Sequence, residues 1–158
     1  MQIYRNEVGI AQFAKGDFEE ALKEFAGSLG IWQDLGINLN TIRALNNIGS
    51  TYFALDELDS AMEAFEEALE IQRSYLIDYF GSKLKQPKER SEALKRALTG
   101  VSETLCNMAY VHKASGSSST ARFFMEEALT IHKTLAPGDP TNEIVDLLSL
   151  LEPDNVHL

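Results

Sequence analysis

Hydrophobic residues recur at helical spacing along most of the chain. Leu45, Ile48 and Tyr52 lie three and four positions apart, and residues 58–69 repeat this spacing. Such spacing places apolar side chains on one face of an α-helix. The pattern and its breaks predict an all-α chain of seven helices. Their predicted ranges are 2–15, 18–35, 39–54, 58–80, 88–114, 118–134 and 141–151.

The chain also repeats itself, because residues 9–31, 49–71 and 109–131 align without gaps. Small residues share two columns of this alignment, and large apolar residues share a third: Gly9, Gly49 and Ala109; Ala21, Ala61 and Ala121; Phe25, Phe65 and Met125. Self-similarity of this kind indicates a repeat architecture. Small residues let two helices approach closely, and large ones fill the space between them. Each unit is therefore expected to be a helix pair that stacks on its neighbours.

This pattern resembles the tetratricopeptide repeat over about residues 3–134, most clearly in "ALNNIGSTYFALDELDSAMEAFEEALEI". The resemblance implies a right-handed superhelical solenoid of antiparallel helix pairs. It predicts a single domain over residues 1–158, with repeats at about 2–35, 39–80 and 88–134 and a capping helix at about 141–152. Ala21 and Ala61 are 40 residues apart, and this longer spacing is similar to that of the kinesin-light-chain subgroup.

The second and third units are 60 residues apart, from Ala61 to Ala121, which predicts two extended helices. One apolar stripe runs over residues 75–80. A second stripe consists of Leu94, Ala97, Leu98, Val101 and Leu105. The two stripes are expected to pack as an antiparallel arm over about residues 75–100. The basic segment 82–96 lies at and just beyond the turn of this arm, and its lysines and arginines are read as a solvated loop.

Two adjacent asparagines, Asn46 and Asn47, stand inside a predicted helix, where each is about 0.6 kcal/mol less favourable than alanine. The resemblance implies that the first helix of each pair lines a concave groove that binds a partner. The groove residues predicted here are Asn6, Arg43, Asn46, Asn47, Ser50, Phe53, Asn107, Tyr110 and Lys113. An amide both donates and accepts hydrogen bonds, which suits the main chain of an extended peptide. The alternative is a helix-to-helix hydrogen bond within the stack.

The charge and the cysteine content indicate which partners and which cellular location to expect. The net charge is −10, and residues 1–80 hold 14 acidic against 5 basic side chains, which disfavours nucleic acid or an anionic membrane as the partner. No apolar run reaches the length of a membrane span, so insertion into a membrane is not expected. Cys106 is the only cysteine, so no internal disulfide can form, and an intracellular, cytoplasmic location is expected.

Candidate chemistry is sparse. His112, His132 and His157 are far apart and do not have the spacing of metal ligands. The sequence therefore predicts no catalytic residues, no metal and no cofactor. Some proteins of the resembled family grip an acidic C-terminus through a carboxylate clamp. At the matching positions Asn6, Ile10, Asn47, Glu103 and Asn107, only Asn47 fits, so this function is not expected.

The resulting hypothesis is a non-catalytic scaffold or adaptor that binds an extended peptide or partner helix from a protein partner. The alternative is a structural subunit of a larger assembly or homo-oligomer. That subunit would use its convex face, its arm or its ends. The chain could also be a fragment of a longer repeat array.

Overall fold

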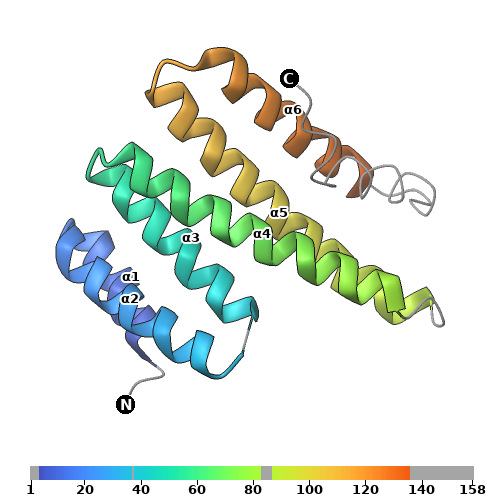
Figure 1. Cartoon of the computed structure of the whole chain (residues 1–158), viewed down its shortest axis with the longest axis horizontal. Coiled ribbons are helices and arrows are strands. Elements are labelled where there is room, and N and C mark those ends of the chain that lie inside the picture. Colours follow the sequence, from blue (N-terminus) through green and yellow to red (C-terminus); the bar gives the residue numbers. More distant parts are fainter. Residues whose placement is uncertain (1–3, 37, 83–86, 136–158) are drawn as a thin grey trace.

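The computed structural model describes residues 4–36, 38–82 and 87–135, and within these ranges every regular element is a helix (Figure 1). The helices are α1 (Arg5–Lys15), α2 (Phe18–Asp34), α3 (Asn38–Ala54), α4 (Leu58–Ser82), α5 (Pro87–Ala114) and α6 (Ser118–Leu135). The six helices predicted for this part of the chain are confirmed. The predicted capping helix at 141–151 lies outside the described residues.

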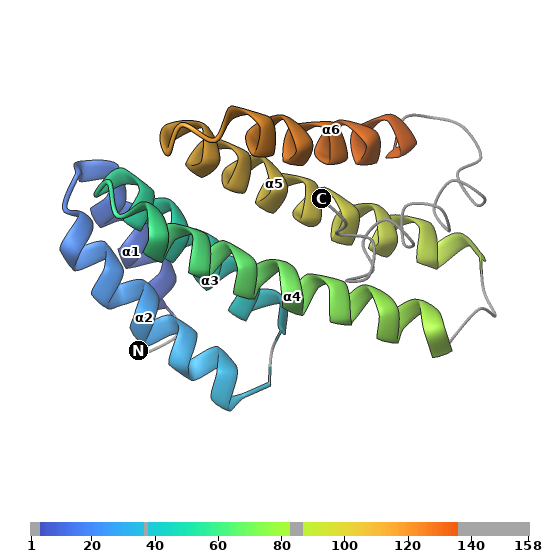
Figure 2. The ribbon, with the colours of Figure 1, turned by 45° about the horizontal axis from the view of Figure 1, so that its top comes forward.

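Each helix packs against the next one in the sequence, so the helices form an all-α repeat solenoid (Figures 1 and 2). Contacts between α2 and α3 join the first pair to the second, and contacts between α4 and α5 join the second pair to the third. Helices α1, α3 and α5 are the first helices of the three pairs. Helix α1 also contacts α3, and α3 contacts α5, although much less extensively. The repeats therefore bury their apolar faces mainly through second helices that lie between first helices.

The same turn joins the two helices of every pair. At the end of α1 the Gly16 N–H donates to the Phe13 carbonyl, and the Asp17 N–H donates to that of Gln12, each at 3.0 Å. Equivalent bonds recur at 56–57 and 116–117. Gly16 and Gly116 take positive φ values of 85° and 81°, as a glycine helix cap requires. Asp56 takes this position in the second pair. Asp17 stands at the N-cap position of α2, a place that suits aspartate, but its carboxylate makes no capping hydrogen bond.

A glycine facing a phenylalanine sets the spacing within the first two pairs. A Cβ built on Gly9 would lie 2.6 Å from the Phe25 ring, and one on Gly49 would lie 2.7 Å from the Phe65 ring. Both rings are almost fully buried. These distances are below van der Waals contact, so only glycine lets the helices approach this closely. The small-against-large pattern of the alignment is therefore confirmed for these two pairs.

The third pair departs from this pattern. Ala109 replaces the glycine and is buried, while Met125, at the position of the phenylalanine, is 39% exposed. The expectation that Met125 fills the gap is therefore wrong. Because the alanine methyl already occupies the space, α6 instead packs on α5 through Ala128 and Ile131, with Phe124 beside them.

The arm forms as predicted by the second apolar stripe and, in the first stripe, by Leu76; Tyr75 is 41% exposed, and the side chains at positions 79 and 80 lie outside the described residues. Helices α4 and α5 have 25 and 28 residues, whereas α2 and α3 have 17 each. One core cluster joins Leu76 of α4 to a stripe on α5: Leu94, Leu98, Val101 and Leu105. Helix α5 continues without a break through this stripe. The long connection between the second and third units is therefore a pair of lengthened helices.

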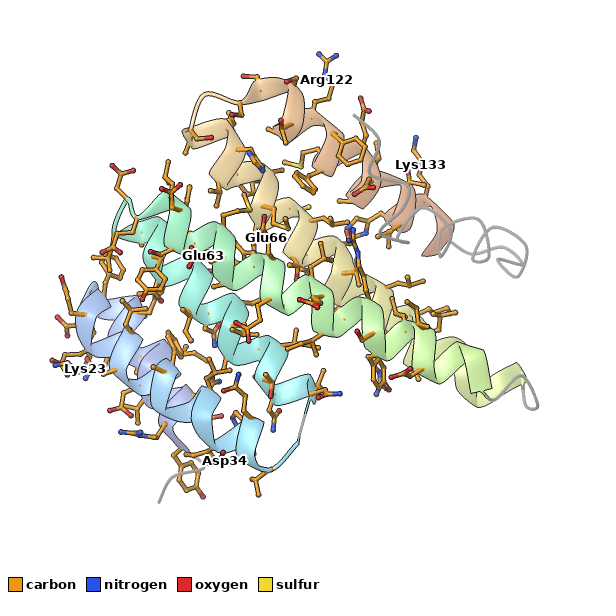
Figure 3. The ribbon with its side chains drawn as sticks, in the orientation of Figure 1. Lys23, Asp34, Glu63, Glu66, Arg122 and Lys133 are labelled. Carbon is orange, nitrogen blue, oxygen red and sulfur yellow. The ribbon has the colours of Figure 1, made fainter. Side chains whose placement is uncertain are left out.

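Charged side chains cover the outside of the stack. Glu63 and Glu66 are exposed on α4, and Arg122 and Lys133 are exposed on α6 (Figure 3). Among the described helices, none combines the length and the apolar character that a membrane crossing requires.

Replacing Gly49 with alanine should lower the free energy of unfolding by about 1–3 kcal/mol, because the added methyl would overlap the buried Phe65 ring. Gly30→Ala is the matched control. Apart from the backbone of its own helix and its two chain neighbours, no described atom lies within 4 Å of a Cβ built on Gly30, so this change should stabilise helix α2 by up to about 1 kcal/mol. Urea titration of both variants measures the difference. Equal effects of the two changes would show that the glycine–phenylalanine contact does not set the helix spacing.

Candidate functional site

The predicted groove residues come from the first helices of the three pairs. Four of them have exposed side chains: Arg43, Phe53, Tyr110 and Lys113. Four are half-buried: Asn46, Asn47, Ser50 and Asn107. Asn6 of α1 is buried. The predicted residues that are exposed or half-buried therefore all lie on α3 and α5, and the surface they form is called the α3–α5 face below.

The doubled asparagine links the first helices to one another. Asn47 Nδ2 donates to Asn6 Oδ1 at 2.9 Å, which joins α3 to α1. Thr104 Oγ1 donates to Asn46 Oδ1 at 3.2 Å, which joins α5 to α3. These are helix-to-helix bonds within the stack, the alternative that the sequence left open. A role of these two amides in holding a peptide stays a prediction.

Asn107 occupies in α5 the position that Asn47 occupies in α3. Its side-chain amide makes no hydrogen bond with any other residue that the structure describes. Its amide is half-buried and stands one helical turn before Tyr110, which is 52% exposed. Each of the other predicted asparagines forms a side-chain hydrogen bond between helices, whereas the Asn107 side chain has no partner among the described residues.

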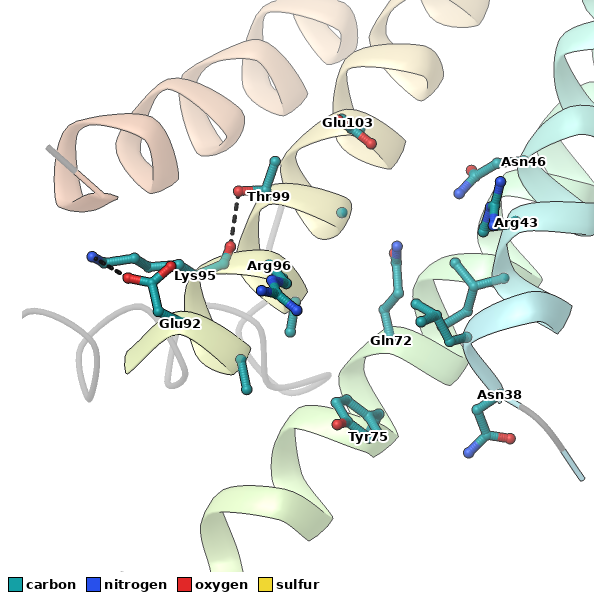
Figure 4. Close-up of a pocket in the computed structure, with 15 residues that line it drawn as sticks. Asn38, Arg43, Asn46, Gln72, Tyr75, Glu92, Lys95, Arg96, Thr99 and Glu103 are labelled. Carbon is teal, nitrogen blue, oxygen red and sulfur yellow. Dashed lines mark hydrogen bonds and ion pairs between the residues drawn. The ribbon is translucent and has the colours of Figure 1, made fainter. Parts of the chain in front are cut away.

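A pocket of about 690 Å³ opens where α3, α4 and α5 meet (Figure 4). Helix α3 lines it with Asn38, Leu39, Ile42, Arg43 and Asn46, α4 with Gln72 and Tyr75, and α5 with side chains between Glu92 and Glu103. We call it the arm pocket. Its volume lies in the range of sites that bind small ligands or a few residues of peptide.

The lengthened helices explain why this pocket exists. Helix α3 begins at Asn38, whereas α4 and α5 continue past that level as the arm. The Thr104–Asn46 bond holds α3 and α5 together on one side of the pocket. Arg43 of α3 and Arg96 of α5 lie on opposite walls of the pocket, and the side chain of Gln72 of α4 extends between them (Figure 4).

The environment of the nucleophilic and metal-binding side chains does not favour catalysis. Burial raises the pKa of the Cys106 thiol, and the nearby Glu103 raises it further, so the thiol stays protonated at neutral pH. The His112 ring stacks on Phe124, with the centroids 5.4 Å apart, as a packing residue would. In the described ranges, no group of His, Cys, Asp and Glu could hold a metal ion.

Sequence reasoning identified only part of the arm pocket. It predicts Arg43 and Asn46 but not Gln72 and Arg96, because the resemblance implies groove residues on the first helices alone. Gln72 belongs to a second helix, and Arg96 was assigned to the solvated basic segment. A signal was present, however, since Gln72 interrupts the run of apolar positions on the inner face of α4.

Comparison with known families fits this architecture. Residues 1–74 match the family model described as "Tetratricopeptide repeat". The matched part of the chain is similar to tetratricopeptide repeats. It covers α1, α2, α3 and most of α4, and tetratricopeptide repeats are generally modules of protein–protein interaction. No curated protein matches the chain.

Asn47→Ala should lower the free energy of unfolding by about 1–2 kcal/mol, because it leaves the buried Asn6 carbonyl without its donor. Asn107→Ala is the matched control at the equivalent position. It should leave stability unchanged or raise it by a few tenths of a kcal/mol, since alanine is the better helix former. Chemical denaturation measures both. An equal loss in the two variants would contradict the assignment of Asn47 to the stack and Asn107 to the surface.

Proposed function

We propose that the chain is a non-catalytic adaptor that binds an extended peptide of a protein partner on the α3–α5 face. The observation that carries the proposal is that α3 exposes Phe53 while α5 exposes Tyr110 and carries the unpaired side-chain amide of Asn107. A few residues, often tyrosine, tryptophan or arginine, supply most of the binding energy at protein interfaces, and an amide can pair with a peptide main chain.

The proposal includes the organisation and location expected from the sequence. In this proposal the chain acts as one domain of three repeats with a capping helix over about residues 141–152, and its 40-residue spacing supports a likeness to the kinesin-light-chain subgroup. Its lone cysteine supports a cytoplasmic location, and its net charge of −10 supports a protein partner rather than nucleic acid. The wide spacing of its histidines supports a function without metal or cofactor.

A second candidate function is that of a structural subunit. Helix α6 exposes Phe123, Met125 and Leu129, and a further repeat or a neighbouring subunit could cover them. The two functions place the partner on different surfaces, so mutations distinguish them.

Tyr110→Ala and Phe53→Ala should each weaken binding of a captured partner peptide by about 1–2 kcal/mol, or roughly 5- to 30-fold, as expected for central aromatic residues. Phe123→Ala is the control, because it truncates an aromatic side chain of similar exposure on α6. Peptides are first selected by display on the full chain, and their affinities are then measured by fluorescence anisotropy. If only Phe123→Ala reduced partner binding, α6 would be the interaction surface and the structural role would replace the adaptor role.

A further inference from the structure

The first helix α1 exposes the face that its counterparts α3 and α5 bury. Three positions show this in each helix: Tyr4, Val8 and Ala11 at α1; Ala44, Ile48 and Thr51 in α3; Thr104, Met108 and Val111 in α5. The six residues of α3 and α5 are at most 9% exposed. In contrast, Tyr4 at the N-cap of α1 is 68% exposed, Val8 is 44% exposed, and Ala11 is exposed as well. We call these three residues the α1 outer face.

A second helix covers the equivalent face in the other two repeats. Helix α2 packs on α3, where Ile48 shares a core cluster with Phe25, and Leu22 and Leu29 of α2 pack against this cluster. Helix α4 packs on α5 in the same way. Helix α1 belongs to the pair at one end of the stack, and no described helix takes this place on it (Figures 1 and 2). The α1 outer face is therefore the free half of an interface that the chain forms twice.

The residues of this face are not those of a solenoid end that meets water. A terminal repeat needs a polar outer face to remain soluble. Helix α6 at the other end follows this rule in part, because Arg122 stands at the position of Leu22 and His132 at that of Trp32. The α1 outer face instead keeps apolar side chains at all three positions. Helix α6 of a second copy is a poor match for it, since Arg122 would lie where α2 places Leu22 on α3.

We propose that the α1 outer face binds an amphipathic helix of a protein partner, which lies on α1 as α2 lies on α3. Leu22 and Leu29 are seven residues apart, so the partner helix carries large apolar residues at this spacing, with a further apolar residue between them. Burial of Tyr4 and Val8 beneath these side chains drives the binding. This surface is separate from the α3–α5 face. The adaptor would therefore hold two partners at once, a helix on α1 and an extended peptide on α3 and α5.

The test uses helical peptides from a display library, selected on the full chain and then synthesised as probes. We expect enriched probes to carry apolar residues at i, i+3 or i+4, and i+7. The double variant Tyr4→Ser/Val8→Ser should weaken their binding about tenfold or more, as expected when central apolar contacts are removed. Ile10→Ser is the matched control. Ile10 is 46% exposed on the same helix, but its counterpart in α3 is Ser50 of the α3–α5 face, so probe binding should stay unchanged.

Other results would overturn the inference. An equal loss of binding in Ile10→Ser and in the double variant would show that the probes do not recognise the α1 outer face. Probes that lose binding only in Tyr110→Ala would lie on the α3–α5 face, which leaves the adaptor function intact. A library that yields no helical binder would also refute the inference, while the extended peptides still test the adaptor function. If the double variant unfolds, Tyr4→Ser alone decides, because Tyr4 is largely exposed.

Sedimentation velocity of the chain alone provides a second test. We expect a species whose mass does not change between wild type and Val8→Ser. A dimer that Val8→Ser dissociates would show that a second copy covers α1, and it would overturn the assignment to a partner helix.

Discussion

The close approach of two helices at a glycine–phenylalanine contact is the constraint on which this structure depends. Gly9 and Gly49 allow the rings of Phe25 and Phe65 to lie where a methyl group would already overlap. Each contact buries a large aromatic ring and fixes the distance between first and second helix. With that distance fixed, second helices fit between the first helices of neighbouring pairs, and the polar positions of α3 and α5 remain on the surface.

Much of this arrangement could be predicted from the sequence, because each contact is local and repeated. The small and large columns of the alignment identified the paired helices, and the stripe from Leu94 to Leu105 identified the lengthened arm. The prediction failed at Met125, where the change from glycine to alanine at position 109 removes the room that a large side chain needs. A column of similar residues does not reveal such a change in packing.

The candidate site could be predicted only in part, since it depends on how neighbouring pairs are placed. The sequence marked Asn46 and Asn47 as unusual, but their partners Thr104 and Asn6 are 58 and 41 residues away. In the sequence, Gln72 looks like any other glutamine in a helix. Its role as a lining residue of the arm pocket follows only from the positions of α3 and α5. Pair-to-pair geometry therefore determines which amides hold the stack together and which remain for a ligand.

The central claim is that a peptide partner binds where α3 and α5 face each other, and hydrogen exchange with a display-selected peptide tests it most directly. The account predicts slower amide exchange in α3 and in the described part of α5 once the peptide is bound, with α6 unchanged. Slower exchange confined to α6, or no change in α3 and α5 at saturating peptide, would contradict it.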